Sequence, residues 1–428
     1  MAVATADSAT PVNSAGAVSR HAALWTLGVF TAINLLNYLD RFIISPLLPV
    51  LKREMGLSDT QLGALVPAFM LVYMFAAPAF GAWGDRRSRT RAISLGVGLW
   101  SIATMLAGFA HGYSHLLAAR AVVGIGEAAF VAIAAAMLAD LFPARDRGRV
   151  YAVLNMAIPV GSALGFILGG VIGHHYGWRA AFFVAGAPGL ALALAVLWMK
   201  DPPRGAQDAL PRVQVAAGQG PVAMYVSLLR RWPYMLVVAG YAAYTFALGG
   251  LAYWMPTFLE RVRGIPIEKA SVSFGEIVVI TGFVGTFAGG WISDYLLRYS
   301  RQAYLWFSGA VTVLAAPAAY LALSASSSAV YMPAIVVAEV LLFMSTGPIN
   351  AAIVNVVSPL ERASAVALSM FMIHLLGDVP SPLLIGYLSD HGGSLGRAVL
   401  IVPLAVLVGG LVWLLAARVN ARTTTARA

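Results

Sequence analysis

Twelve long apolar runs set the limits on what this chain can fold into. Crossing a bilayer as a helix takes about 20 mostly apolar residues. Of the 428 residues, 60% are hydrophobic and 11% are charged, whereas soluble proteins average about a quarter charged. We therefore predict an all-α membrane protein with twelve transmembrane helices. The predicted spans are 23–50, 60–83, 91–111, 115–142, 149–173, 178–199, 233–260, 270–293, 303–323, 330–352, 361–389 and 395–418.

The placement of basic residues predicts the orientation. A net charge of +10 could indicate nucleic-acid binding, but the basic residues cluster in short loops between apolar runs, as the positive-inside rule expects. With a cytoplasmic N-terminus, 19 of them fall on inner segments and 7 on outer segments. We therefore expect both termini in the cytoplasm, a location in the plasma (inner) membrane, and no nucleic-acid partner.

The spans divide into two bundles of six, expected over 23–199 and 233–418. A cytoplasmic linker is expected over 200–232, because Pro202, Pro203 and Gly205 interrupt the apolar pattern there. Residues 1–22 are interpreted as a disordered tail rather than a cleaved signal, and 419–428 as a second tail. The chain has no cysteine, so disulfides and thiolate metal sites are excluded.

The two bundles repeat one another. Gly81, Asp85 and Arg89 follow the second span, and Gly290, Asp294 and Arg298 follow the eighth, each pair 209 residues apart. Two six-span halves in the same orientation indicate parallel repeats about an axis normal to the membrane. In such transporters the substrate site lies near the midplane between the halves, and transport is a rocking of one half against the other.

The sequence after the second span resembles a known signature. Gly81-Ala-Trp-Gly-Asp-Arg-Arg-Ser-Arg89 is similar to the loop motif of the major facilitator superfamily, and Arg120-Ala-Val-Val-Gly124 resembles the Arg-x-x-x-Gly motif of that family's fourth helix. More narrowly, residues 25–415 resemble the Spinster family of lipid transporters. The stretches that carry this resemblance are 34–41, 123–128, 246–256 and 362–386.

The resemblance implies a gate on the cytoplasmic face. In that family Asp85 would close the inner face by pairing with a helix end and with an arginine near the end of the fourth span, for which Arg145, Arg147 or Arg149 could serve. Asp140 is a further partner. Tyr295 stands in the second copy where Arg86 stands in the first, so we expect the second half of the gate to be weaker.

Polar side chains inside the first span form the leading candidate site. Four of them recur at i, i+3, i+4 and i+7 and share one helix face: Asn34, Asn37, Tyr38 and Arg41. Asp40 lies beside them. An ionisable residue within the membrane is a functional candidate by default; the alternative is a structural ion pair that locks two helices together.

A second charged pair lies on the fourth span. Arg120 and Glu127 are seven residues apart and share a face. The first and fourth helices line the central cavity of the resembled fold, so Glu127 could meet Arg41. Burial disfavours an ionised carboxylate and a nearby guanidinium favours it. We predict that Glu127 or Asp40 exchanges a proton with Arg41 as the fixed counter-charge; a permanent buried pair is the alternative.

The second half carries further candidates for substrate contact. His374 and Asp378 stand at i and i+4 on the eleventh span, where they could relay a proton or clip a helix kinked by Pro380 and Pro382. No second ligand at metal spacing accompanies them, so no metal site is expected. The remaining candidates are Tyr241, Tyr244 and Thr245 on the seventh span, and Glu339 and Asn350 on the tenth, with Glu339 equally compatible with a helix-packing hydrogen bond.

These observations predict a secondary active transporter that works by alternating access without a cofactor. The Spinster resemblance implies an amphipathic anion as substrate, of the lysophospholipid or sphingosine-phosphate type, with proton coupling. The alternative is a proton-coupled carrier of a small organic anion or drug on the same fold. No catalytic constellation stands out, so an enzyme is not expected. Membrane lipids and protons are the other expected partners, and the chain is expected to be a monomer.

Overall fold

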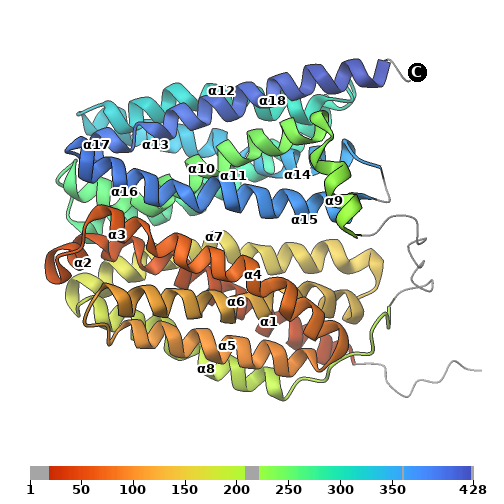
Figure 1. The fold of residues 1–428 in the computed structure, drawn as a ribbon, viewed down its shortest axis with the longest axis horizontal. Coiled ribbons are helices and arrows are strands. Elements are labelled where there is room, and N and C mark those ends of the chain that lie inside the picture. Colours follow the sequence, from red (N-terminus) through yellow and green to blue (C-terminus); the bar gives the residue numbers. More distant parts are fainter. Residues whose placement is uncertain (1–18, 208–220, 359–360, 426–428) are drawn as a thin grey trace, which may run out of the picture.

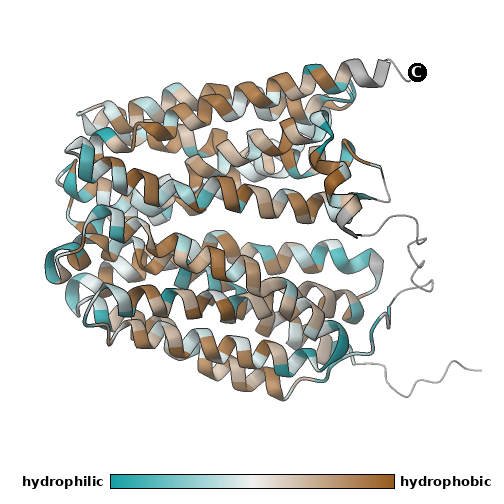
Figure 2. Cartoon of the chain, in the orientation of Figure 1, coloured by the Kyte–Doolittle hydropathy of each residue, from teal (hydrophilic) through white to brown (hydrophobic). Residues whose placement is uncertain are grey.

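The structure, a computed structural model, describes residues 19–207, 221–358 and 361–425. Twelve helices in these residues are long and apolar enough to cross a membrane, which confirms the predicted fold class. Hydrophobic residues run along the middle of the helices, and hydrophilic residues gather at their ends (Figure 2). The predicted tail 1–22 lies almost wholly outside the described residues, and so does 208–220 of the linker.

The first six spans form the N-half (Figure 1). Most of them are single helices, and the first two are assembled from shorter helices because prolines and glycines interrupt them. The elements are α1 (Arg20–Ile43), η1 (Ser45–Leu47), α2 (Leu48–Met55), α3 (Asp59–Gly63), α4 (Leu65–Arg86), α5 (Arg89–Ala107), α6 (Tyr113–Leu141), α7 (Ala144–His175) and α8 (Trp178–Leu197).

The last six spans form the C-half. Its tenth, eleventh and twelfth spans are again broken into shorter helices. The elements are α10 (Trp232–Arg261), α11 (Ile267–Leu296), α12 (Ala303–Ser324), α13 (Ser328–Phe343), α14 (Thr346–Asn355), α15 (Arg362–Ile373), the π-helical turn η3 (His374–Asp378), α16 (Pro380–Gly392), α17 (Leu395–Ala398) and α18 (Ile401–Thr425).

Several predicted boundaries differ from the structure. The first span begins at Arg20, inside the predicted tail 1–22, and the fifth begins at Ala144 rather than at 149. The linker contains a helix, α9 (Pro221–Leu229). The last span continues past 418, because α18 runs to Thr425. Asn420 stabilises this extension, since its side-chain amide donates to Ala416 O at 2.8 Å and to Pro233 O, at the start of α10, at 3.4 Å.

The two halves lie side by side and meet most closely at one end (Figure 1). We call the end with the linker and both chain termini the tail side, and the opposite end the far side. On the far side, Ser45 Oγ donates to Tyr253 O at 2.6 Å and Tyr253 OH donates to Leu62 O at 2.7 Å. Towards the tail side, α4 and α15 diverge (Figure 1). The halves are therefore joined at the far side.

Helices α7 and α11 form a second contact between the halves. Small residues bring the two backbones together: a Cβ on Gly275 would lie 3.1 Å from Ala163 O, and a Cβ on Gly170 would lie 2.4 Å from the Ser271 side chain. Larger side chains at these glycines would push the helices apart. The glycine-rich part of the fifth span thus serves close packing, as small residues do in membrane bundles.

Candidate functional site

The structure joins the first and fourth spans through a buried ion pair. Arg41 Nε lies 2.8 Å from Glu127 Oε2. The Glu127 side chain is fully buried, and that of Arg41 is 14% exposed. The contact between Arg41 and Glu127 that the resembled fold led us to expect is therefore present, although its role in proton exchange stays a prediction.

Three aromatic rings surround the Arg41 guanidinium. Its Cζ lies 5.2 Å from the Tyr38 ring centroid, 5.1 Å from that of Phe69 and 5.0 Å from that of Tyr73. Cations are attracted to ring faces within about 6 Å. Phe69 and Tyr73 are one turn apart on α4, so α4 supplies much of this aromatic wall.

A second charged group lies one residue away. Asp40 is buried and accepts a hydrogen bond from Thr104 Oγ1 of α5 at 2.6 Å. Arg120 is also buried; its Nη1 lies 3.4 Å from Asp40 O, and its Cζ lies 5.1 Å from the Phe69 ring centroid. Two carboxylates and two guanidiniums therefore share the core of the N-half, and their formal charges cancel.

Several polar atoms in this core have no hydrogen-bond partner among the described residues. They are Asp40 Oδ1, Glu127 Oε1, Arg120 Nε and both amide atoms of Asn37. Buried polar groups in proteins are almost always satisfied by protein or ordered water. These atoms are therefore available to bind water, a proton or a polar group of a substrate.

The shared face of the first span divides between packing and the site. Asn34 is buried and donates to Leu154 O of α7 at 2.9 Å, so it joins two helices of the N-half and is not accessible to a substrate. Tyr38 and Arg41 are partly exposed. The accessible part of the stripe is therefore its far-side end.

The C-half presents His374 and Asp378 towards the same region. His374 Nδ1 lies 2.9 Å from Asp378 Oδ2, within η3, and both side chains are partly exposed. Across the division between the halves, η3 contacts α4, the helix that carries Phe69 and Tyr73. The pair therefore lies where the two halves adjoin.

Other predicted contacts of the C-half serve helix packing. Tyr244 is buried, donates to Leu342 O at 2.7 Å and lies against Trp413 with 5.4 Å between ring centroids. Thr245 Oγ1 donates to backbone oxygens, including Ile373 O at 3.1 Å. Glu339 is buried without a hydrogen bond among the described residues. Asn350 is exposed and donates to Thr346 O at 2.8 Å. Tyr244 is thus inaccessible to a substrate in this structure.

The residues of the predicted gate form different ion pairs from those expected. Arg89, not Asp85, is the centre: its Nη1 lies 2.5 Å from Asp140 Oδ2, and its Nε lies 2.7 Å from Asp201 Oδ1. Asp85, Arg86 and Arg149 are exposed and form no ion pair within the described chain. In the part of the chain that the structure describes, Asp85 forms no ion pair with Arg145, Arg147 or Arg149, although all four lie in the N-half, so their pairing in a closed gate stays a prediction.

The other residues predicted to belong to the gate form separate contacts. Arg147 Nη2 donates to Ala139 O at 2.8 Å, near the end of α6. In the second copy of the signature, Asp294 accepts from Tyr304 OH at 2.7 Å, and Arg298 stacks on Tyr295. A Cβ on Gly81 would meet no atom within 4 Å, so the close approach that would require this glycine is absent here.

Sequence reasoning missed an ion cluster that ties the halves together on the far side. Asp59 Oδ1 lies 2.7 Å from both Lys52 Nζ and Arg261 Nη1, and Asp59 Oδ2 accepts from Ser389 Oγ at 2.6 Å. Asp390 accepts from the backbone N–H groups of Asp59 and Thr60. We call these residues the far-side latch: Lys52, Asp59, Thr60, Arg261, Ser389 and Asp390. Charges in loops gave no signal that they meet.

Comparison with known proteins identifies relatives along most of the chain. The family model of the Major Facilitator Superfamily matches residues 30–382. "Protein spinster" of Drosophila melanogaster is 32% identical over 377 residues, which are 86% of this chain and 62% of that protein, so the chain spans under two thirds of it. "Protein spinster homolog 1" of Bos taurus is 35% identical over 397 residues, covering 88% and 74% of the two chains.

Solved structures show the same fold. A bacterial homolog to the human lysosomal transporter Spinster, in an inward-facing and unoccupied conformation, superposes with a TM-score of 0.86 at 24% identity over 95% of this chain and 99% of that one. The nucleoside transporter NupG superposes with a TM-score of 0.73 at 13% identity, covering 91% and 98% of the two chains.

Proposed function

Because the chain belongs to the major facilitator superfamily and to its Spinster family, and is thus a multi-pass membrane transporter rather than an enzyme, we propose that it carries an amphipathic anion of the lysophospholipid or sphingosine-phosphate type. The observation that carries the proposal is the Arg41 site: a partly exposed cation, paired to a buried carboxylate and walled by aromatic rings.

The chemistry of this site suits an amphiphile. Arginine binds phosphate and carboxylate oxygens through a planar fork of donors, so Arg41 would hold an anionic headgroup. The rings of Tyr38, Phe69 and Tyr73 offer apolar surface beside it. The partly exposed pair of His374 and Asp378 lies on η3, which contacts α4, so a headgroup with a hydroxyl or ammonium group would find partners there.

Proton coupling would arise because Glu127 and the anionic substrate compete for Arg41. When Glu127 is ionised, it holds the guanidinium by an ion pair. When Glu127 takes up a proton, the pair loses its charge attraction, and Arg41 is free to bind an anion. Protonation of Glu127 and binding of the anion therefore favour one another, and deprotonation on the other side of the membrane would release the anion.

The proposed orientation places the tail side in the cytoplasm of a plasma-type membrane. Basic residues concentrate on that side, as the positive-inside rule expects. The far-side latch then closes the outer face, and this conformation is inward-facing. Alternating access would require the latch to open while the gate around Arg89 and Asp85 closes.

Transport into proteoliposomes tests the proposal. We expect uptake of a labelled lysophosphatidate, stimulated by a proton gradient, and little uptake of small organic anions such as benzoate. Arg41→Gln should abolish this uptake, whereas Arg53→Gln, at a 62% exposed side chain, should leave it unchanged. Uptake of the small anion but not of the lysolipid would favour the alternative carrier and overturn the lipid assignment.

A further inference from the structure

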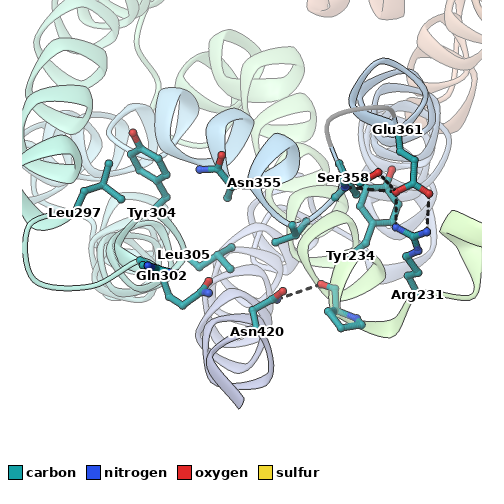
Figure 3. A pocket seen from close by; sticks show the side chains of 15 residues that line it. Arg231, Tyr234, Leu297, Gln302, Tyr304, Leu305, Asn355, Ser358, Glu361 and Asn420 are labelled. Atoms are coloured by element: carbon teal, nitrogen blue, oxygen red, sulfur yellow. Dashed lines mark hydrogen bonds and ion pairs between the residues drawn. The ribbon is translucent and has the colours of Figure 1, made fainter. Parts of the chain in front are cut away.

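A large cavity opens in the C-half on the tail side (Figure 3), and Arg41 is not part of its lining. Its volume is about 1140 Å³, and it lies among the tail-side ends of α10, α11, α12, α14 and α18. Ligand pockets typically measure roughly 300–1,000 Å³. Its lining is mixed: Leu297 and Leu305 are apolar, whereas Arg301, Asn355 and Asn420 are polar. The proposed transport site uses none of these residues.

The matching place in the N-half is filled by the chain itself. There the linker crosses the ends of α4, α5 and α6: Arg204 Nη2 donates to Gly84 O at 2.7 Å, and Gly205 N donates to Asp140 Oδ1 at 2.9 Å. The carboxylate of Asp201 binds both the backbone N–H and the side chain of Arg89. An anionic group thus occupies this position of the repeat in the N-half.

In the C-half the corresponding basic residues have no such anion. Arg298, which matches Arg89 in the repeat, stacks on Tyr295 with 5.2 Å to the ring centroid. Arg301 lines the cavity. Among the described residues neither forms an ion pair; the nearby Asp294 accepts a hydrogen bond from Tyr304. The connection between α11 and α12 therefore presents two guanidiniums without an ion pair, of which Arg301 lines the cavity and Arg298 does not.

The remaining charges of the cavity do not change this balance. Arg231 Nη1 and Nη2 bind the two carboxylate oxygens of Glu361 at 2.6 and 2.5 Å (Figure 3). This bidentate pair is neutral as a whole, so Arg301 leaves the lining with a net positive charge. An anion that enters would meet Arg301 and the amide of Asn355, with apolar wall beside them.

We infer that this cavity binds the phosphate headgroup of an anionic phospholipid from the tail-side leaflet, as a site separate from transport. Two observations converge on it: the volume, and the guanidinium of Arg301, unpaired among the described residues, in a lining that also offers an apolar wall. Basic pockets between helix ends on the cytoplasmic side bind anionic headgroups. The apolar wall of Leu297 and Leu305 distinguishes a lipid from a free phosphate ion, since only a lipid has a chain to place against it.

Native mass spectrometry of the purified full chain tests this inference, with phosphatidylglycerol, phosphatidylcholine and inorganic phosphate as separate probes. We expect phosphatidylglycerol to bind more tightly than phosphatidylcholine. Arg301→Gln should weaken phosphatidylglycerol binding about fivefold, the loss expected for one arginine facing anionic lipid. Asn355→Trp should weaken it by filling the cavity without changing the charge.

The matched control is Arg145→Gln, which removes one positive charge from the tail side of the N-half, where the arginine side chain is 86% exposed. It should leave phosphatidylglycerol binding unchanged. Equal weakening by Arg301→Gln and Arg145→Gln would overturn the site, because only the overall charge would then matter. Full competition by excess inorganic phosphate would overturn the lipid as the source of the anion. The readout is binding, so it does not depend on whether the chain transports lipid.

Discussion

Arg41 is held by a carboxylate on one side and by three rings on the others. A buried ion pair is weak evidence for stability, because desolvation offsets its charge attraction. The partial exposure of Arg41 suggests a function instead, because a substrate can reach the guanidinium and the neighbouring groups already orient it. The neighbouring Asp40 is tied to Thr104 instead, so the two acids of this core have separate partners.

Glu127→Gln tests the coupling role at this scale. The variant keeps the shape of the side chain and removes its proton exchange, so transport should lose its response to a proton gradient. Leaving Arg41 without its counter-charge should also lower stability by about 3 kcal/mol. Uptake at several pH values and thermal unfolding measure the two effects. Glu276→Gln, at an exposed carboxylate of α11, is the control; unchanged pH dependence in Glu127→Gln would exclude Glu127 as the coupling site.

The sequence predicts contacts between residues better than it predicts what surrounds them. Helical periodicity, together with the helix arrangement of the resembled family, was enough to predict the contact between Arg41 and Glu127. Phe69 and Tyr73 could not be foreseen, because an aromatic residue in an apolar span gives no sign of which way it faces. Asn34 shows the converse: it shares the predicted polar stripe, but the rotation of α1 against α7 turns it into the packing interface.

At the scale of elements, the candidate residues His374 and Asp378 lie at a break in a helix. The prolines at 380 and 382 predicted a kink in the eleventh span; the structure forms a π-helical turn just before them, at His374–Asp378. A π turn adds a residue to the helix and is often found at functional sites. It also brings Gly377 onto α10, where a Cβ would lie 2.1 Å from Thr245 Oγ1 and 2.9 Å from Ala242 O.

Gly377→Ala should therefore destabilise this element. The added methyl group would force η3 away from α10, at a cost of about 1–3 kcal/mol for overpacking. Thermal unfolding in detergent measures the loss. Gly392→Ala, at the end of the same span with no atom within 4 Å of the added Cβ, should change stability by less than about 0.5 kcal/mol. Equal effects of the two variants would contradict the close packing.

The pair between α10 and α15 gives a prediction about acid. Arg231 hydrogen-bonds Glu361 and so lowers the pKa of that carboxyl. The pair therefore contributes stability above the ordinary glutamate pKa of about 4.3, and loses it as the pH falls through the lowered pKa of the folded state. Since Arg231 is 42% exposed, the contribution should stay below about 1 kcal/mol.

Arg231→Gln should lower stability near neutral pH by less than about 1 kcal/mol, a deficit that shrinks as the pH falls through the lowered pKa of Glu361, and it should leave the pH dependence of transport between pH 5 and 8 unchanged. Thermal unfolding across a pH series measures the difference between the variant and the wild type. Arg230→Gln, an exposed neighbour, is the matched control. A change in the transport profile of Arg231→Gln near neutral pH would show that this pair takes part in coupling.

For the whole molecule, the repeat made the architecture predictable, whereas the conformation could not be predicted. Twelve apolar runs and a 209-residue offset predict two parallel bundles. Every conformation of a rocking transporter is built from the same spans, so the sequence pattern does not say which side is closed. The far-side latch answers this question because its residues come from both halves: Asp59 from the N-half, and Arg261 and Ser389 from the C-half.

Asp59→Asn should weaken the closure of the far side. It removes the charge that Lys52 and Arg261 share, so we expect a shift of about 1.4 kcal/mol or more towards an open far side, or about tenfold in population. The chain has no native cysteine, so Thr257→Cys, at a buried position of α10 beside Ser45, can report opening by its reaction with an impermeant maleimide.

Labelling of Thr257→Cys should be about tenfold faster with Asp59→Asn than without it. Arg53→Gln is the control: it breaks only the exposed pair with Glu260, so it should change the rate little. Equal labelling rates with and without Asp59→Asn would mean that other contacts hold the far side closed.

The packing of α7 against α11 has a consequence for how the halves move. Gly275 lies against Ala163 and Gly170 lies against Ser271, and the Phe166 and Phe274 rings pack with 5.0 Å between their centroids, so the contact is made largely through dispersion forces. Such a contact allows one bundle to rotate against the other while the distance between the axes of α7 and α11 stays constant. The free-energy difference between the inward-facing and outward-facing states would then depend on the ionic groups at the two ends of the molecule. Single charges there would determine which state predominates at rest.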